Sequence, residues 1–164
     1  MLRSLLLGGL LIMETQKMIS SRKAIREYSG QITDYQLHEI LTAANASPVA
    51  MGQYDNYRLT VIQDPATLAK MSGVYDAPTV IVVSTNNAGA PEEVSAGAIV
   101  HNMELAAEDQ GLGANYNMGG LSSIPADVIP SGFTPVFGLT VGQTTEKFAP
   151  REVPMDRIKT NFVK

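Results

Sequence analysis

The feature that most constrains the fold is a run of β-branched residues at positions 78–84, with the sequence PTVIVVS. A continuous apolar run of this length, without alternation, is typical of a central strand that is buried on both faces. Two further strands are predicted, because residues 57–63 alternate in the manner of a half-buried strand and residues 135–141 form the last strand of the chain. We therefore expect a sheet with other elements packed on both of its faces.

Two helices are predicted before the first strand. The pattern over residues 14–21 is helical. The second helix begins at Thr33, which forms a capping box with Gln36 three residues later, and its apolar residues recur on one face. It should end near residue 46, because Pro48 disfavours helical geometry at the residue before it.

Two more helices are predicted after the first strand. The step from Asp64 to Pro65 starts a short helix that runs to about residue 71. The longest helix covers residues 91–110: its first turn is acidic, as the helix dipole favours, and Gly111 follows its end. Its side chains are unusually small, which lets other elements approach closely, so we expect it to be central.

The order of these elements lacks the regular βαβ rhythm of a Rossmann domain and favours an α+β fold. No internal repeat, low-complexity block or linker divides the chain, so residues 14–164 are interpreted as a single domain and residues 1–13 as an N-terminal extension. The leucine-rich residues 1–12 look like a signal peptide. However, the apolar run is too short to span a membrane, no small-residue cleavage site follows, and Met13 is a natural alternative start.

Composition limits the chemistry that the chain can perform. The net charge of -4 and the lack of a dense basic stripe argue against nucleic acid as a partner, because phosphate backbones require clustered lysine and arginine. The absence of cysteine excludes disulfides, thiolate metal sites and thiol nucleophiles, and two histidines, His38 and His101, are too few for a histidine-rich metal site. Redox chemistry would need a bound organic cofactor. Charged residues are only 17% of the chain, which indicates that part of the surface is covered. The simplest cover for a short chain is a second copy of itself.

Three cations, Arg22, Lys23 and Arg26, lie within five residues near the start of the chain. The spacing of four between Arg22 and Arg26 puts both guanidinium groups on one face of a helix. Arginine binds phosphate through paired hydrogen bonds, so the cluster is a candidate anion site. The alternative is a solvated charged face that Glu27 partly neutralises.

The tail of the chain, residues 147–164, is interrupted by proline and carries the cations Lys147, Arg151 and Arg157. If the tail folds back towards Arg22, the two groups of cations could share one phosphate. The tail also carries apolar side chains that need to be buried, either against a partner subunit or against the chain's own surface: Phe148, Val153, Met155, Ile158 and Phe162.

Two segments are candidates for the walls of a ligand pocket. Residues 117–120, NMGG, contain glycines that would let backbone N–H groups approach a flat ligand; the alternative is an ordinary exit from a strand into a turn. Residues 47–53 form a non-helical stretch of small side chains between a helix and a strand. Three aromatic residues are candidates for stacking on the ligand or for the core: Tyr54, Tyr116 and Phe133.

Four segments, in this order and spacing, resemble the FMN-dependent nitroreductase family. Residues 20–28, SSRKAIREY, look like the family's R-R-S-I-R-x-[FY] start, and residues 46–54, ASPVAMGQY, look like its A-P-S-x-x-N-x-Q-P-W segment. Residues 75–84, YDAPTVIVVS, are similar to its A-P-x-x-I-x-V strand, and residues 102–113, NMELAAEDQGLG, to its N-M-x-L-A-A-x-x-x-G-L-G helix. The resemblance implies a central, mainly antiparallel sheet flanked by helices, in a homodimer with exchanged C-terminal tails.

The resemblance also implies roles for single residues. Arg22 and Lys23 would bind the phosphate and ribityl chain of FMN, with Ala24 in the position of a usual serine, and Arg26 would approach the N1/O2 edge of the flavin ring. Gln53 would hydrogen-bond the pyrimidine edge, and Ser47 and Pro48 would serve the flavin of the neighbouring subunit. Backbone groups of Met118 and Gly119 would face N5. Arg151 and Lys147 would contact the phosphate.

The implied activity is that of a cytoplasmic NAD(P)H oxidoreductase that works by a ping-pong mechanism. NADH or NADPH would donate hydride to flavin N5 and leave, and a nitroaromatic or quinone-like acceptor would then take the electrons, with no membrane or nucleic acid involved. No side chain need act as acid or base, because the flavin carries the chemistry. One alternative is a flavin-binding protein with little turnover, for storage or sensing; another is a cofactor-free interaction domain.

The chain departs from the family pattern at three points. Ala24 lacks the hydroxyl group that serine would offer to the cofactor. Gly52, Tyr54 and Asp55 break the N-x-Q-P-W pattern around Gln53. The chain is also shorter than typical members, which implies the loss of the helical excursion that covers the substrate pocket. The acceptor is therefore the least defined part of the prediction.

Overall fold

The structure, a computed structural model, describes residues 14–164. The predicted N-terminal extension over residues 1–13, with its leucine-rich run, lies outside the described residues. No helix within residues 14–164 is both long and apolar enough to span a membrane.

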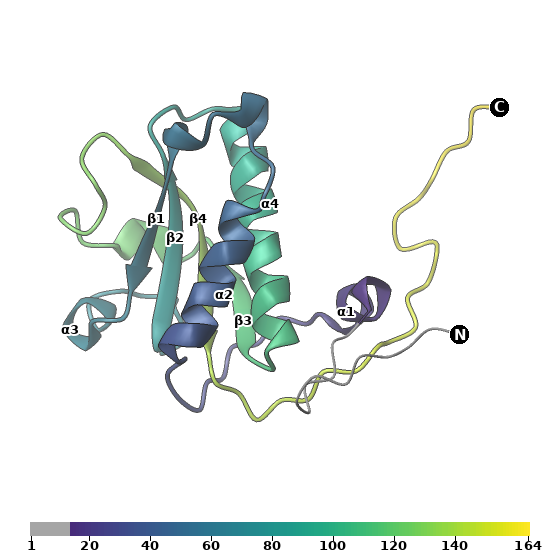
Figure 1. Cartoon of the computed structure of the whole chain (residues 1–164), viewed down its shortest axis with the longest axis horizontal. Helices are drawn as coiled ribbons and strands as arrows, with labels where there is room; N and C mark the ends of the chain where they lie inside the picture. The colour runs from purple at the N-terminus through teal and green to yellow at the C-terminus, as the bar shows by residue number, and fades with distance from the viewer. Residues whose placement is uncertain (1–13) are drawn as a thin grey trace.

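One antiparallel sheet of four strands, in the order β1-β2-β4-β3, forms the centre of the molecule (Figure 1). The strands are β1 (Tyr57–Ile62), β2 (Thr79–Thr85), β3 (Gly113–Asn117) and β4 (Thr134–Gly142). Every residue of β2 is buried, because this strand has a neighbour at each edge and cover on each face. The prediction of a central strand at this position is confirmed.

Two apolar cores cover the two faces of the sheet. Ile81 and Val83 of β2 belong to the larger core, whereas Val80 and Val82 belong to the smaller one. Successive side chains of a strand point to opposite faces, so a run without alternation fills both cores at once. The mainly antiparallel α+β architecture predicted from the sequence is confirmed.

The larger core lies under two helices that run side by side across the sheet, α2 (Asp34–Asn45) and α4 (Ala90–Asp109) (Figure 1). The predicted capping box starts α2: the Thr33 hydroxyl oxygen accepts from the Gln36 backbone, and the Gln36 side chain accepts from the Thr33 backbone. The small side chains of α4 let it lie centrally, as predicted. It ends before Gly111, which adopts a φ of 74°.

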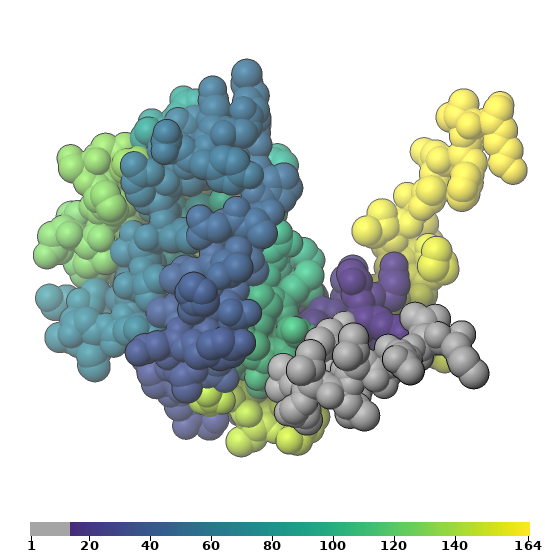
Figure 2. Space-filling view, in the orientation of Figure 1, coloured from purple at the N-terminus to yellow at the C-terminus, as the bar shows by residue number. Residues whose placement is uncertain are grey.

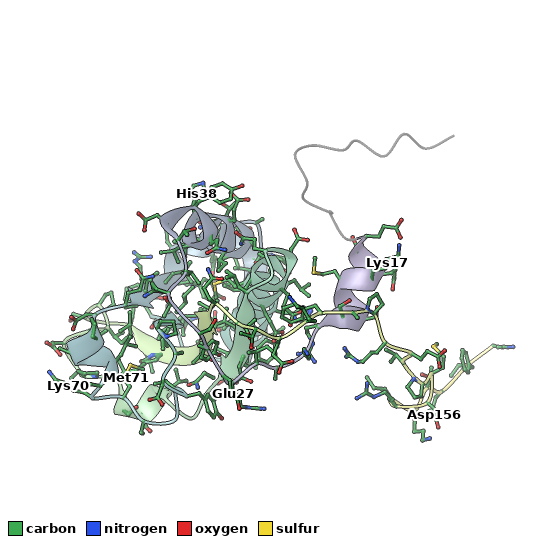
Figure 3. The ribbon with its side chains drawn as sticks, turned by 90° about the horizontal axis from the view of Figure 1, so that it is seen from below. Lys17, Glu27, His38, Lys70, Met71 and Asp156 are labelled. Atoms are coloured by element: carbon green, nitrogen blue, oxygen red, sulfur yellow. The ribbon has the colours of Figure 1, made fainter. Side chains whose placement is uncertain are left out.

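The smaller core is covered by α3 (Pro65–Leu68) and by a segment without regular helix that follows β3 and includes η3 (Leu121–Ser123). The predicted helix over residues 64–71 is too long. Beyond Leu68, backbone hydrogen bonds span three residues, from Met71 N–H to the Leu68 carbonyl, and this tighter turn carries Met71 into the smaller core. Figure 3 shows Met71 beside Lys70, at the side of the molecule remote from the tail residue Asp156.

Strand β3 was not among the strands predicted outright. The sequence indicated it only in the alternative interpretation of residues 117–120, as an exit from a strand into a turn. The strand is present: β3 pairs along its length with β4 and leads into the turn at residues 118–120, and a ligand contact at this turn stays a prediction. Its five residues, GANYN, include no β-branched side chain, so their composition gave little signal. Gly113 is required at its start, because a Cβ atom there would lie 2.6 Å from the Ile25 side chain.

The prediction that Arg22 and Arg26 share a helix face is wrong. The helix α1 (Thr15–Ser21) ends before Arg22, and residues 22–29 run without helical structure. The physical reason is pairing with the sheet: Ile25 N–H donates to the Ala114 carbonyl at 2.9 Å, and Ser29 N–H donates to the Gln143 carbonyl at 2.8 Å. These bonds to β3 and to the end of β4 outweigh the local helical preference.

The end of the C-terminal tail stands clear of the body of the molecule (Figure 2), whereas Arg151 holds the start of the tail to the Ser20 carbonyl. The exposed fraction is 94% for Met155, 83% for Ile158 and 81% for Phe162. For these three side chains, burial against the chain's own surface, one of the two expectations, is therefore wrong, whereas Phe148 is partly buried, with its ring centre 5.7 Å from Lys23 Nζ. Burial against a partner subunit stays a prediction.

Candidate functional site

Four of the six cations predicted near the two ends of the chain line one pocket, and Arg26 and Arg157 are not among them. A pocket of about 370 Å³ lies where the end of α1 meets the tail, and it is lined by Arg22, Lys23, Ala24, Lys147 and Arg151 among others. Arg151 joins the two segments: its guanidinium group donates to the carbonyl oxygens of Ser20, at 2.7 Å, and Arg22. We call this hollow the cation pocket.

Two of these cations have anionic partners. Arg22 forms a salt bridge of 3.3 Å with Glu104 of α4, and Lys23 forms one of 2.5 Å with Glu146. Within residues 14–164, Lys147 and Arg151 form none. The pocket thus keeps unneutralised positive charge, and Lys23, whose partner is half exposed, can exchange it cheaply.

Two carboxyl groups of α4 lie buried behind the cation pocket, and the sequence interpretation missed both. Glu104 and Glu108 are 1% and 2% exposed. Burial raises the pKa of both groups, and that of Glu108 to about 7. Arg22 opposes the increase in the pKa of Glu104. The Lys23 N–H group, which donates to Glu108 at 3.0 Å, opposes the increase in the pKa of Glu108. Their spacing of four on one helix face was the available signal. They hold Arg22 and the Lys23 backbone in place.

A histidine and a tyrosine flank this group on the side of α4 that carries Glu104. His101 Nδ1 and the Tyr116 hydroxyl group are 2.5 Å apart, and the Tyr116 ring packs edge to face against Phe137. Burial lowers the pKa of His101, with Arg22 adding to the effect, and burial raises the pKa of Tyr116 to about 12. Both side chains are therefore neutral at pH 7 and present a partly exposed aromatic surface.

The predicted ring-edge segment, Met118 and Gly119, follows β3 in an open turn. Met118 is 63% exposed, and a Cβ atom on Gly119 would meet nothing within 4 Å, so this backbone is accessible. Asn117 fixes the turn: its Oδ1 accepts from Gly120 N–H at 2.9 Å, and its Nδ2 donates to the Gly73 carbonyl at 2.7 Å. The sequence did not mark Asn117 as the residue that holds the turn.

Arg26 lies apart from Arg22 and meets a different partner. Its guanidinium carbon is 5.6 Å from the centre of the Tyr75 ring, and within residues 14–164 it forms no salt bridge. Tyr75 belongs to the turn that Asn117 binds through Gly73. Arg26 is thus associated with the segment of Met118 and Gly119 rather than with the cation pocket.

The predicted site residues at 47–53 lie on another side of α4. Ser47 is fully buried, and its Oγ accepts from Asn102 Nδ2 at 2.9 Å. Asn102 and Glu104 are two residues apart, so their side chains point about 200° apart around the helix axis. The structure therefore separates Ser47 from Arg22 by the width of α4.

Pro48 and Gln53 belong to the same region as Ser47. Ala50, between them, donates its N–H to Ser95 Oγ at 3.0 Å, and Ser95 precedes Glu108 by about 20 Å along the helix. Pro48 lines a shallow apolar hollow together with Val94, which is 75% exposed. Gln53 is exposed. One chain therefore does not bring Gln53 together with Arg22, although the sequence interpretation put both on one flavin.

Metal chemistry has no candidate centre in this part of the chain. Within residues 14–164, no group of three or more histidine, cysteine, aspartate or glutamate side chains could hold a metal ion.

Comparisons with known proteins agree on one fold. A sequence model of the nitroreductase family matches residues 65–140. No curated protein sequence matches the chain. Among solved structures, a nitroreductase with bound FMN from Desulfitobacterium hafniense is 19% identical, with a TM-score of 0.72 over 90% of this chain and 96% of that one.

Two further solved structures are equally similar. A putative NADH dehydrogenase/NAD(P)H nitroreductase from Parabacteroides distasonis is 20% identical, with a TM-score of 0.73 over 89% of this chain and 96% of that one. An FMN-dependent nitroreductase from Clostridium difficile is 22% identical, with a TM-score of 0.68 over 89% and 97%. At identities this low, the structural similarity establishes the fold alone. The resemblance to the nitroreductase family is confirmed.

Proposed function

We propose that this chain, which has the nitroreductase fold, is an FMN-dependent oxidoreductase that oxidises NADH or NADPH and reduces a nitroaromatic or quinone-like acceptor. The observation that carries the proposal is the convergence of Arg22, Lys23, Lys147 and Arg151 on one pocket, from segments more than a hundred residues apart. Residues 14–164 would form the single functional domain. A cytoplasmic location is part of the proposal.

The cation pocket suits the phosphate of FMN. A phosphate dianion prefers several converging cations, and arginine offers paired hydrogen bonds with the right spacing. Arg151 is pre-oriented by two backbone carbonyl oxygens, and Lys147 lies free of carboxylate partners within the described residues. Ala24 lines the same pocket but offers no hydroxyl group, and the hydroxyl group of Ser21 donates to the Lys17 carbonyl, so the charged contacts to phosphate would come from the cations.

The ring of FMN would extend from this pocket towards Arg26 and the open turn at Met118 and Gly119. FMN supplies hydride transfer at N5. Arg26 would place a positive charge near the N1/O2 edge, where it favours the reduced, negatively charged form. The accessible backbone of Met118 and Gly119 would face N5. No side chain of this set needs to gain or lose a proton.

The separation of Ser47, Pro48 and Gln53 from Arg22 supports a homodimer. Because α4 stands between the two groups within one chain, both can contact one flavin only if they belong to different subunits. We therefore assign Gln53, together with Ser47 and Pro48, to the flavin of the partner. The exposed tail supports the same assembly, since an exchanged tail would bury Met155, Ile158 and Phe162.

The first test is the visible absorption spectrum of the protein after incubation with FMN and removal of free ligand. We expect bound flavin near one per subunit, and loss of retention in the double variant Arg22→Ala/Arg26→Ala with an unchanged far-ultraviolet circular dichroism spectrum. A matched control changes Arg157, on the exposed tail, to alanine. Flavin retained by the double variant would refute the site.

Steady-state oxidation of NADH and NADPH then separates the enzyme from its rival. Turnover that requires both FMN and an acceptor supports the oxidoreductase. Retained flavin without turnover, under a range of nitroaromatic and quinone acceptors, would favour a flavin-binding protein for storage or sensing. A protein that binds no FMN at all would be a cofactor-free interaction domain.

A further inference from the structure

The turn at residues 73–76 has an unfavourable backbone. Gly73 has a φ of 70°, and Tyr75 and Asp76, two and three residues later, have φ values of 57° and 52°. Glycine adopts this left-handed region freely and aspartate tolerates it, whereas tyrosine does so only at a cost in free energy. Such a conformation persists only where the surroundings impose it, and it clusters at functional sites.

The surroundings that impose the turn are those of the candidate flavin site. The Gly73 carbonyl accepts from Asn117 Nδ2 at 2.7 Å, and Ser72 N–H donates to Ser123 Oγ at 2.9 Å. Val74 is buried in the smaller core and packs so closely on Gly120 that a Cβ atom there would lie 2.8 Å from the Val74 side chain. The turn is therefore fixed to the segment that carries Met118 and Gly119.

What the turn presents is the ring of Tyr75. This side chain is 45% exposed, so its conformation does not serve to bury it. Its ring instead lies 5.6 Å from the guanidinium carbon of Arg26, a distance at which a cation and an aromatic face attract. Neither the neighbouring Asp76 nor any other carboxylate within residues 14–164 forms a salt bridge with Arg26, so the positive charge stays unneutralised.

We propose that Tyr75 is a positioning residue for Arg26: the strained turn holds the aromatic ring against the guanidinium group and so fixes its positive charge next to the segment of Met118 and Gly119. The inference rests on the proposed function, in which Arg26 acts on the flavin. Without the ring, Arg26 would be free to move into solvent. Its charge would then favour the reduced cofactor less strongly.

The test is the midpoint potential of bound FMN in the full-length protein, together with the thermal midpoint of unfolding. The informative variant is Tyr75→Asn, because asparagine accepts a left-handed backbone but has no ring. We expect it to raise the thermal midpoint and to weaken the preference for reduced over oxidised FMN about tenfold, which lowers the potential of a two-electron couple by about 30 mV. Tyr75→Phe keeps the ring and should retain the wild-type potential.

Two controls complete the experiment. Tyr35→Asn changes another exposed tyrosine, on α2, and should leave the potential unchanged. Arg26→Ala should lower the potential at least as far as Tyr75→Asn, and the double variant no further than Arg26→Ala alone. If Tyr75→Asn is more stable but keeps the wild-type potential, the inference is overturned. A lowered potential in Arg26→Ala would, in that case, still uphold the proposed flavin site. Equal shifts in Tyr75→Phe and Tyr75→Asn would also overturn it, because the ring would then not be the cause.

Discussion

Two sides of one helix, α4, do different work with different chemistry. On one side Asn102 and Ser95 hold the segment of residues 47–53 through neutral hydrogen bonds. On another side Glu104 and Glu108 hold Arg22 and the Lys23 backbone through buried carboxyl groups. A neutral contact is insensitive to pH, whereas a buried carboxyl group carries a desolvation cost that depends on its charge. The comparison teaches that the segment carrying Arg22 and Lys23 is held by contacts whose strength depends on pH, whereas residues 47–53 are held by contacts that do not.

The largest expected effect breaks the ion pair on the charged side. Arg22→Met should lower the free energy of unfolding at pH 8 by about 3 kcal/mol, the lower end of the range for breaking a buried pair, because the Arg22 side chain is 32% exposed. Urea denaturation measures the change. The matched control is the double variant Arg22→Met/Glu104→Gln, which removes the stranded charge and should recover most of the loss. A single-variant effect below about 1 kcal/mol would contradict the prediction, because at pH 8 neither a stranded Glu104 charge nor its protonation costs so little.

A smaller effect concerns pH. The pKa of Glu108, about 7 in the fold, lies above its ordinary value of 4.5, so the folded state binds more protons between these values and its stability falls as pH rises through this window. Glu108→Gln keeps an acceptor for Lys23 N–H but cannot ionise. From pH 5 to pH 8 we expect the wild type to lose about 2 kcal/mol relative to this variant, measured by urea denaturation at each pH. Parallel profiles for the two proteins would show that Glu108 does not titrate in the fold.

The smallest effect belongs to the neutral side. Asn102→Ala removes one hydrogen bond to Ser47, whose Oγ still donates to the Ala43 carbonyl at 2.9 Å. The expected loss is about 1 kcal/mol, the usual net contribution of one hydrogen bond, and it should be equal at pH 5 and pH 8. A pH-dependent loss would erase the distinction between the two sides of α4.

Much of the fold was predictable because local patterns and tertiary packing agree. The run at Val80 to Val83 fills two cores by simple alternation, and the capping box at Thr33 is complete within four residues. The small side chains of α4 predicted its central place. In each case the information lies in neighbouring residues, so a sequence can carry it.

The rest depended on contacts between distant segments. Residues 22–29 leave the helix because Ile25 pairs with Ala114, and no local pattern announces that bond. Tyr75 adopts a left-handed backbone that its own side chain disfavours, so its place beside Arg26 could not be read from the sequence. The separation of Gln53 from Arg22 follows from which face of α4 each segment meets. Of the predicted cations, Arg22, Lys23, Lys147 and Arg151 line one pocket, whereas Arg26 and Arg157 do not, and the helical basis of the prediction was wrong.

The exposed tail described above has a consequence for the lifetime of the protein. It carries Arg157 and Lys159 on an exposed backbone without helix or strand, which is the form of chain that trypsin-like proteases cleave. An exchanged tail would be shielded by the second subunit, and dissociation at low concentration would expose it again. Under the proposed assembly, the protein's resistance to degradation would therefore rise with its own abundance, and the rate of tail cleavage would report how much of it is paired.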